Sequence, residues 1–157
     1  MIKPPEIYGE WIPLLKEFAE GKNDREVVPA MQAGTIPCFQ LVLERFARRL
    51  QEALDQRYSR LVEEFQARGN PGNPEAAEGM VENLGRGLFQ LKQAVTLPGL
   101  PESLRDRFPA EIQDGADRIQ ASLEASARQS HSGELQHILQ LHPVNRWEEK
   151  QNHEQPK

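Results

Sequence analysis

The sequence has little of what builds a covalently linked or metal-held scaffold. Cys38 is the single cysteine among 157 residues, so an intrachain disulfide and a cysteine-based zinc site are both excluded. Cys38 falls in the first turn of a predicted helix, where the helix dipole favours a thiolate. A catalytic thiol also needs a positioned base, and the pattern supplies none. We therefore interpret Cys38 as a structural residue.

Long apolar runs are also missing. No stretch approaches the roughly 18 apolar residues of a membrane span, and the first residues lack the apolar core of a signal peptide. We expect a cytoplasmic protein that does not enter a membrane. The formal net charge of −5 argues against a general binder of phosphate backbones.

Aromatic and β-branched residues are few, and no useful stretch alternates apolar with polar residues. Hydrophobic residues make up 38% and charged residues 27%, which favours thin helical packing over a deep mixed core. The sequence therefore predicts an all-α fold.

The longest amphipathic stretch covers residues 36–68, with Thr35 as the predicted cap. At helical spacing its apolar residues form one stripe about 120° wide, and the helix would be about 50 Å long. The stripe consists of Phe39, Leu43, Phe46, Leu50, Leu54, Tyr58, Leu61 and Phe65. A rod that is apolar along one side needs packing partners along its whole length.

The Gly- and Pro-rich segment Gly69–Pro74 predicts a tight reversal after this helix. A second amphipathic helix is expected over 75–95. After a further reversal at 97–101, a third helical region is expected, broken near Phe108 and Pro109 and continuing over 110–128. A short amphipathic piece follows at 135–141.

Before the long helix, the sequence predicts a short helix followed by a loop. Trp11 and Phe18 lie at helical spacing in a short helix that Gly21 ends. Residues 25–34 are predicted to be a loop that places Val27 and Met31 against the core.

Together these patterns predict an antiparallel helical bundle of three main helices, with a short N-terminal helix and a C-terminal helical appendage. We divide the chain into an N-terminal arm (1–35), a helical bundle (36–142) and a disordered tail (143–157).

Candidate metal ligands are sparse. Glu134 and His137 have the i, i+3 spacing of di-iron carboxylate bundles, but no second pair of this kind exists. His131, His137 and His142 are spaced by six and five residues, which does not place them on one helical face. We therefore expect no metal and no cofactor, and we predict that the chain is not an enzyme.

Arginines on the polar face of the long helix suggest an alternative. Arg45, Arg48, Arg49 and Arg60 could contact a phosphate backbone. Glutamates are interleaved with them, including Glu44 four residues before Arg48, and this spacing is typical of a salt-bridged solvent face.

Two apolar residues lie away from the stripes of their own helices, Leu41 on the long helix and Phe89 on the second. Together with Tyr8 and Trp11 of the N-terminal segment, they suggest a second apolar surface that is covered by the N-terminal helix, by a second copy or by another protein. The function expected from the sequence is that of a non-catalytic interaction protein, a small subunit or adaptor. A nucleic-acid-associated subunit is the alternative.

Overall fold

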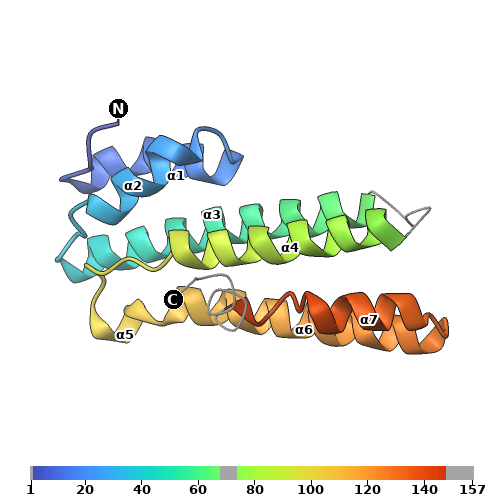
Figure 1. Ribbon diagram of the computed structural model, residues 1–157. Coiled ribbons are helices and arrows are strands. Elements are labelled where there is room, and N and C mark those ends of the chain that lie inside the picture. Colours follow the sequence, from blue (N-terminus) through green and yellow to red (C-terminus); the bar gives the residue numbers. More distant parts are fainter. Residues whose placement is uncertain (1, 68–73, 148–157) are drawn as a thin grey trace, which may run out of the picture. The chain divides into compact units, whose positions relative to one another are not determined.

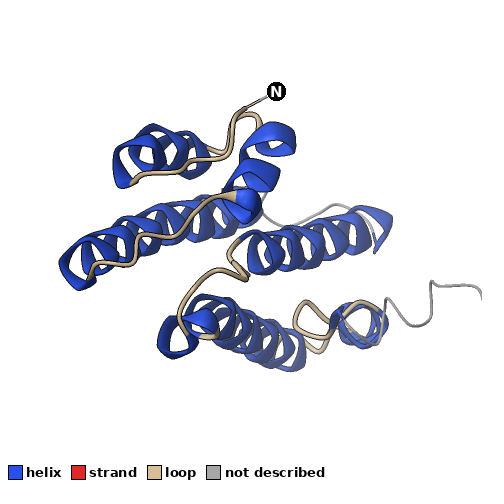
Figure 2. Cartoon of the chain, turned by 90° about the vertical axis from the view of Figure 1, so that its left-hand side faces the viewer, coloured by secondary structure: helices blue, strands red, loops and turns tan. Residues whose placement is uncertain are grey.

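The computed structural model describes residues 2–67 and 74–147, and in these residues the secondary structure is helical, with no strand (Figures 1 and 2). The helices are α1 (Tyr8–Glu20), α2 (Asp24–Ala33), α3 (Gln40–Ala67), α4 (Pro74–Ala94), α5 (Glu102–Arg105), α6 (Arg107–Gln129) and α7 (Gly133–Leu141). The predicted all-α class is confirmed. The predicted reversal after Arg68 lies outside the described residues, except that Pro74 begins α4. None of the described helices combines the length and the hydropathy needed to cross a bilayer.

The chain divides into two compact units, and each unit combines segments that are distant in sequence. The first unit comprises Met1–Arg60 and Leu91–Ala110, and the second comprises Leu61–Gln90 and Glu111–Lys157. Helices α3, α4 and α6 each contribute one part to both units.

In the first unit, the two N-terminal helices lie side by side (Figure 1). Gly21 ends α1 in the left-handed conformation with a φ of 74°, and its N–H donates to the carbonyl of Phe18. Pro13 lies within α1, near enough to its start to be tolerated.

The predicted loop at residues 25–34 is wrong, because these residues form most of α2. Val27 and Val28 are β-branched and Pro29 lacks an N–H, so the local signal for a helix is weak. Burial overrides that signal: Val27, Ala30 and Met31 lie three and four residues apart and are all buried. The expectation that Val27 and Met31 reach the core is confirmed.

The long helix α3 begins at Gln40, four residues later than predicted. Both backbone groups of Thr35 have other partners: its N–H donates to the carbonyl of Pro5 at 2.7 Å, and its carbonyl accepts from Trp11 Nε1 at 2.7 Å. Thr35 also lies five residues before Gln40, too far away to cap α3. Pro37 further disfavours the helical conformation at Ile36, whose side chain is buried.

The core of the first unit is formed by α1, α2 and α3, by the segment between α4 and α5, and by the start of α6, whereas α5 has no buried residue. Its largest buried side chains are Trp11, Phe18, Met31, Phe46, Leu50, Leu54, Leu97, Leu100 and Phe108. The ring of Trp11 meets that of Phe46 edge-on, with centroids 4.7 Å apart. The expected break near Phe108 falls at Asp106, and Pro109 lies in the first turn of α6, where a helix needs no N–H.

In the second unit, a polar stripe on α6 holds the segment that follows α7. Gln113 Nε2 donates to the carbonyl of Asn145 at 2.9 Å, and Asp117 Oδ1 accepts from Asn145 Nδ2 at 2.9 Å. The buried Gln120 accepts from the backbone N–H of Val144 at 3.0 Å through its Oε1 atom. This segment is thus anchored by side chains spaced along one face of a helix.

The apolar core of the second unit includes Val81, Leu84, Leu88, Ile112, Ala116, Ala127, Ile138, Leu139, Val144 and Trp147. Val144 and Trp147 fall in the predicted disordered tail, but both side chains are buried, and the ring centroids of Trp147 and Phe89 are 5.7 Å apart. Two apolar residues three positions apart carry no detectable period, so the pattern could not reveal them. The remainder of the predicted tail, residues 148–157, lies outside the described residues.

Candidate functional site

The most exposed large apolar side chains of the described residues gather in the first unit, where α3 begins. Phe39 is 81% exposed and Leu41 is 73% exposed. The prediction placed Phe39 on the buried stripe, but the late start of α3 leaves it in solvent. Leu41 is exposed, as expected for a residue opposite the stripe. Leu43, two residues further on, is half-buried.

A groove of about 640 Å³ adjoins these residues, still within the first unit. One wall comes from Cys38 and the first turns of α3, and the other from Ser103 and Leu104 of α5 and Arg107 of α6. Glu44 and Glu52 supply acidic groups to the lining, and Arg48 and Arg107 supply basic ones. The lining therefore combines apolar residues, among them Leu43 and Leu104, with charged residues of both signs. We call Phe39, Leu41, Leu43 and this groove the α3 surface.

Of the other interface residues predicted from the sequence, Trp11 is fully buried and is bound to Thr35, so it contributes to the core and not to a surface. Tyr8 is half-buried, and its hydroxyl accepts a hydrogen bond from Arg49. Phe89 belongs to the second unit and is half-buried against Trp147. The four predicted interface residues therefore do not form one surface, and of the four only Leu41 lies on the exposed apolar surface.

The four arginines of the alternative hypothesis also separate by environment. Arg45 and Arg48 are exposed on α3. Arg49 Nε donates to the hydroxyl of Tyr8 at 2.9 Å, and Arg60 donates to the backbone carbonyl of Glu20. These two side chains connect α3 to α1 and therefore contribute to the packing of the two helices.

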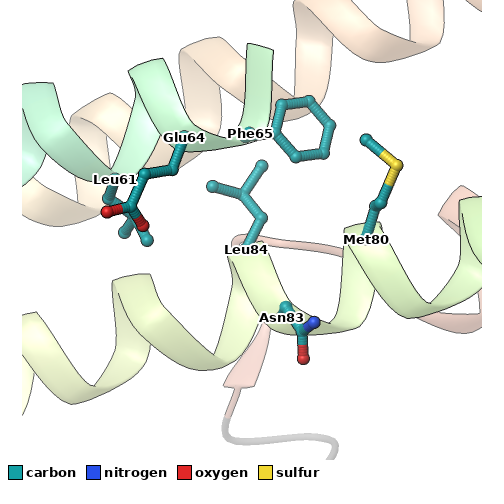
Figure 3. A pocket seen from close by; sticks show the side chains of 6 residues that line it. All are labelled: Leu61, Glu64, Phe65, Met80, Asn83 and Leu84. Atoms are coloured by element: carbon teal, nitrogen blue, oxygen red, sulfur yellow. The ribbon is translucent and has the colours of Figure 1, made fainter. Parts of the chain in front are cut away.

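A small hollow of about 50 Å³ lies in the second unit, between the end of α3 and the start of α4 (Figure 3). Met80 and Leu84 point from α4 toward α3, where Leu61 and Phe65 lie, whereas Asn83 points away. The volume is far below the roughly 300 Å³ at which ligand pockets begin. We interpret this hollow as a packing gap.

Three potential metal ligands meet elsewhere in the second unit. His142 Nε2 lies 3.0 Å from Glu78 Oε1 and 3.2 Å from Glu82 Oε1, and the three ligand atoms are all within 4.8 Å of one another. The side chain of His142 is 17% exposed, and those of Glu78 and Glu82 are 46% and 32% exposed. We call these residues the Glu78–Glu82–His142 cluster.

This cluster was not predicted from the sequence, where His142 was considered only together with His131 and His137. Glu134, His137 and His131 are exposed and do not belong to it, whereas His142 does. The available signal was Glu78 and Glu82 at i, i+4 on a predicted helix. Their histidine lies some sixty residues further along the chain, where no spacing rule could find it.

Cys38 is an exposed free thiol that lines the groove. Its exposure does not support the interpretation of Cys38 as a structural residue.

Comparison of the chain with protein-family models, with curated proteins and with solved structures gave no match.

Proposed function

We propose that this chain is a non-catalytic interaction protein, and that the α3 surface binds a second copy of the chain. The observation that carries the proposal is the exposure of Phe39 and Leu41, two large apolar side chains two residues apart. Exposed apolar groups beside a groove are typical of interaction surfaces on proteins in water.

The choice of a second copy as the partner follows from the charges of the groove. A twofold interface brings the same surface together with itself, so its charges must complement one another after the rotation. The lining contains two acidic residues, Glu44 and Glu52, and two basic residues, Arg48 and Arg107. A surface with this balance is compatible with its own copy, and burial of Phe39 and Leu41 would stabilise the pair by roughly 25 cal/mol for each Å² of apolar area removed from water.

The same proposal includes the antiparallel arrangement of α3, α4 and α6 expected from the sequence. Its support is that these are the longest described helices, with 28, 21 and 23 residues, and that each carries an amphipathic pattern. A bundle of this kind acts as a support for a surface, and we assign no reaction to it.

Light scattering coupled to size-exclusion chromatography tests self-association. We expect wild type to have twice the mass of one chain at micromolar concentration, and the double variant Phe39→Glu, Leu41→Glu to have the mass of a single chain. Leu141→Glu is the matched control, because Leu141 is also an exposed apolar residue, at 55%, but lies in the second unit. It should leave the mass unchanged.

A wild-type protein that stays monomeric at high micromolar concentration would overturn the proposal, and so would a double variant that remains dimeric. Retention on duplex DNA tests the alternative function. Phosphate contacts weaken steeply as salt rises, so binding at 50 mM salt that disappears at 200 mM salt, and is lost in Arg45→Glu, Arg48→Glu, would favour nucleic-acid binding.

A further inference from the structure

We propose that the Glu78–Glu82–His142 cluster binds one divalent transition-metal ion, with zinc as the ion that suits it best. The cluster lies within the second unit and is independent of the α3 surface. Carboxylate oxygen and imidazole nitrogen are both zinc ligands, and open zinc sites use three protein ligands with a water in the fourth position.

The spacing of the ligand atoms fits such an ion. Zinc binds nitrogen and oxygen at about 2.0–2.2 Å, so two ligands at adjacent positions are about 3.0–3.5 Å apart. The distances from His142 Nε2 to Glu78 and to Glu82 are 3.0 and 3.2 Å. The two carboxylate oxygens lie within 4.8 Å of each other, so binding would draw them together until both are about 2.1 Å from the ion, as its coordination distance requires.

Hydrogen bonds from His142 Nε2 cannot fully satisfy both carboxylates. The Nε2 atom carries at most one hydrogen, yet two carboxylate oxygens lie against it. Glu78 and Glu82 are also like charges at i, i+4 on one helix, a pairing that destabilises a helix. Even a protonated His142 leaves the trio with a net charge of −1, whereas a divalent cation brought to the neutral histidine balances both carboxylates.

The histidine is held in place from both sides. His142 directly follows α7, and its N–H donates to the carbonyl of Ile138 at 2.8 Å. Two residues later, the backbone N–H of Val144 donates to Oε1 of the buried Gln120 at 3.0 Å. The backbone at Val144 also lies close to Gly85, since a Cβ on Gly85 would be in van der Waals contact with Val144 Cα, at 3.5 Å. Gly85 lies on α4, three residues after Glu82. The close approach of these backbones positions the imidazole over the two carboxylates before any ion arrives, which lowers the cost of binding.

Isothermal titration of the full-length, tag-free protein with zinc chloride tests the inference. We expect one zinc ion per chain, and binding at least tenfold weaker in Glu82→Gln and in His142→Gln. The matched control is Glu134→Gln, His137→Gln, which changes the same residue types at exposed positions of α7 and should alter the affinity less than twofold. Cobalt(II) provides a direct readout of the ligands, because its visible absorption bands should appear with wild type and disappear with His142→Gln.

Circular dichroism of each variant shows whether it folds. If His142→Gln does not fold, the zinc affinity of Glu82→Gln, which keeps the shape of the side chain, tests the inference. The inference is overturned if zinc does not bind, if Glu82→Gln binds zinc as tightly as wild type, or if the control loses binding equally. It is also overturned if calcium or magnesium binds at this cluster and zinc does not.

Discussion

Arg57 of α3 binds Asp24, the first residue of α2, through two parallel hydrogen bonds: Nη1 donates to Oδ1 and Nη2 donates to Oδ2, each at 2.9 Å. The same guanidinium group donates to the carbonyl of Phe18 at 3.0 Å and lies 4.9 Å from the centre of the Phe18 ring. One side chain thus fixes both N-terminal helices to α3 within the first unit, with the rigid fork geometry that arginine alone provides.

Replacing Arg57 should therefore destabilise the first unit. We expect Arg57→Ala to lower the free energy of unfolding by about 1–3 kcal/mol, because it removes three charge-assisted hydrogen bonds, two of them to the Asp24 carboxylate. Urea denaturation measures the change. Arg45→Ala is the control, since Arg45 is exposed on the same helix, and it should change stability by less than about 0.5 kcal/mol. Equal effects of the two substitutions would show that Arg57 does not hold the helices together.

Gly34 should tolerate no side chain. A Cβ at this position would lie 2.6 Å from Trp11 Cζ2 and 2.8 Å from Pro5 Cγ, and both atoms belong to rings that cannot turn aside. We expect Gly34→Ala to destabilise the protein by about 1–3 kcal/mol, the usual cost of overpacking.

Gly9 of α1 offers the opposite case, because a Cβ there meets nothing within 4 Å. Gly9→Ala should stabilise the protein by up to about 1 kcal/mol through its higher helix propensity. Thermal melts of the two variants should therefore shift in opposite directions. A stabilised Gly34→Ala would mean that the contact between Pro5 and Trp11 is looser than described.

Trp147 should be a core residue of the second unit. It is 6% exposed and lies against Phe89, so Trp147→Ala should cost about 3–5 kcal/mol, as is usual for a buried aromatic residue. Its neighbour Arg146 is exposed, and Arg146→Ala should have little effect on the melting temperature. If both variants melt like wild type, the segment after α7 contributes no stability and belongs to the tail that the sequence pattern suggested.

Glu10 should make the start of α1 sensitive to acid. Its carboxylate accepts from the backbone N–H of Glu6 at 2.9 Å and of Ile7 at 3.3 Å, and the bond from Glu6 is the main cause that holds the pKa of Glu10 below its ordinary value of 4.5. Because the pKa is lowered in the folded state, the stabilisation is fully present above the ordinary value and is lost as the pH falls through the folded-state pKa.

An NMR titration of the Glu10 carboxyl carbon should therefore show a midpoint below 4.5. The stability difference between wild type and Glu10→Gln should shrink as the pH falls through that midpoint. A midpoint at or above the ordinary value would contradict the hydrogen bonds described at this helix start.

The sequence by itself determined the helical class and most helix positions. Periodic apolar residues define α3, α4, α6 and α7, because a helix with one apolar face must bury it and the period survives in any context. Glycine and proline marked the end of α1 and the break before α6 for equally local reasons. Leu41 was also correctly separated from its stripe, because the angle around a helix axis depends only on residue number.

Only the tertiary structure decided the rest, because those features depend on partners far away in the chain. Burial of Val27 and Met31 makes α2 a helix against its weak propensity, and the bonds of Thr35 to Pro5 and Trp11 delay α3 and expose Phe39. His142 meets Glu78 and Glu82 only once the second unit has folded. Periodicity records which face of a segment is apolar, whereas the backbone hydrogen bonds and ligand sets that complete a fold are set by contacts between segments, which no local pattern encodes.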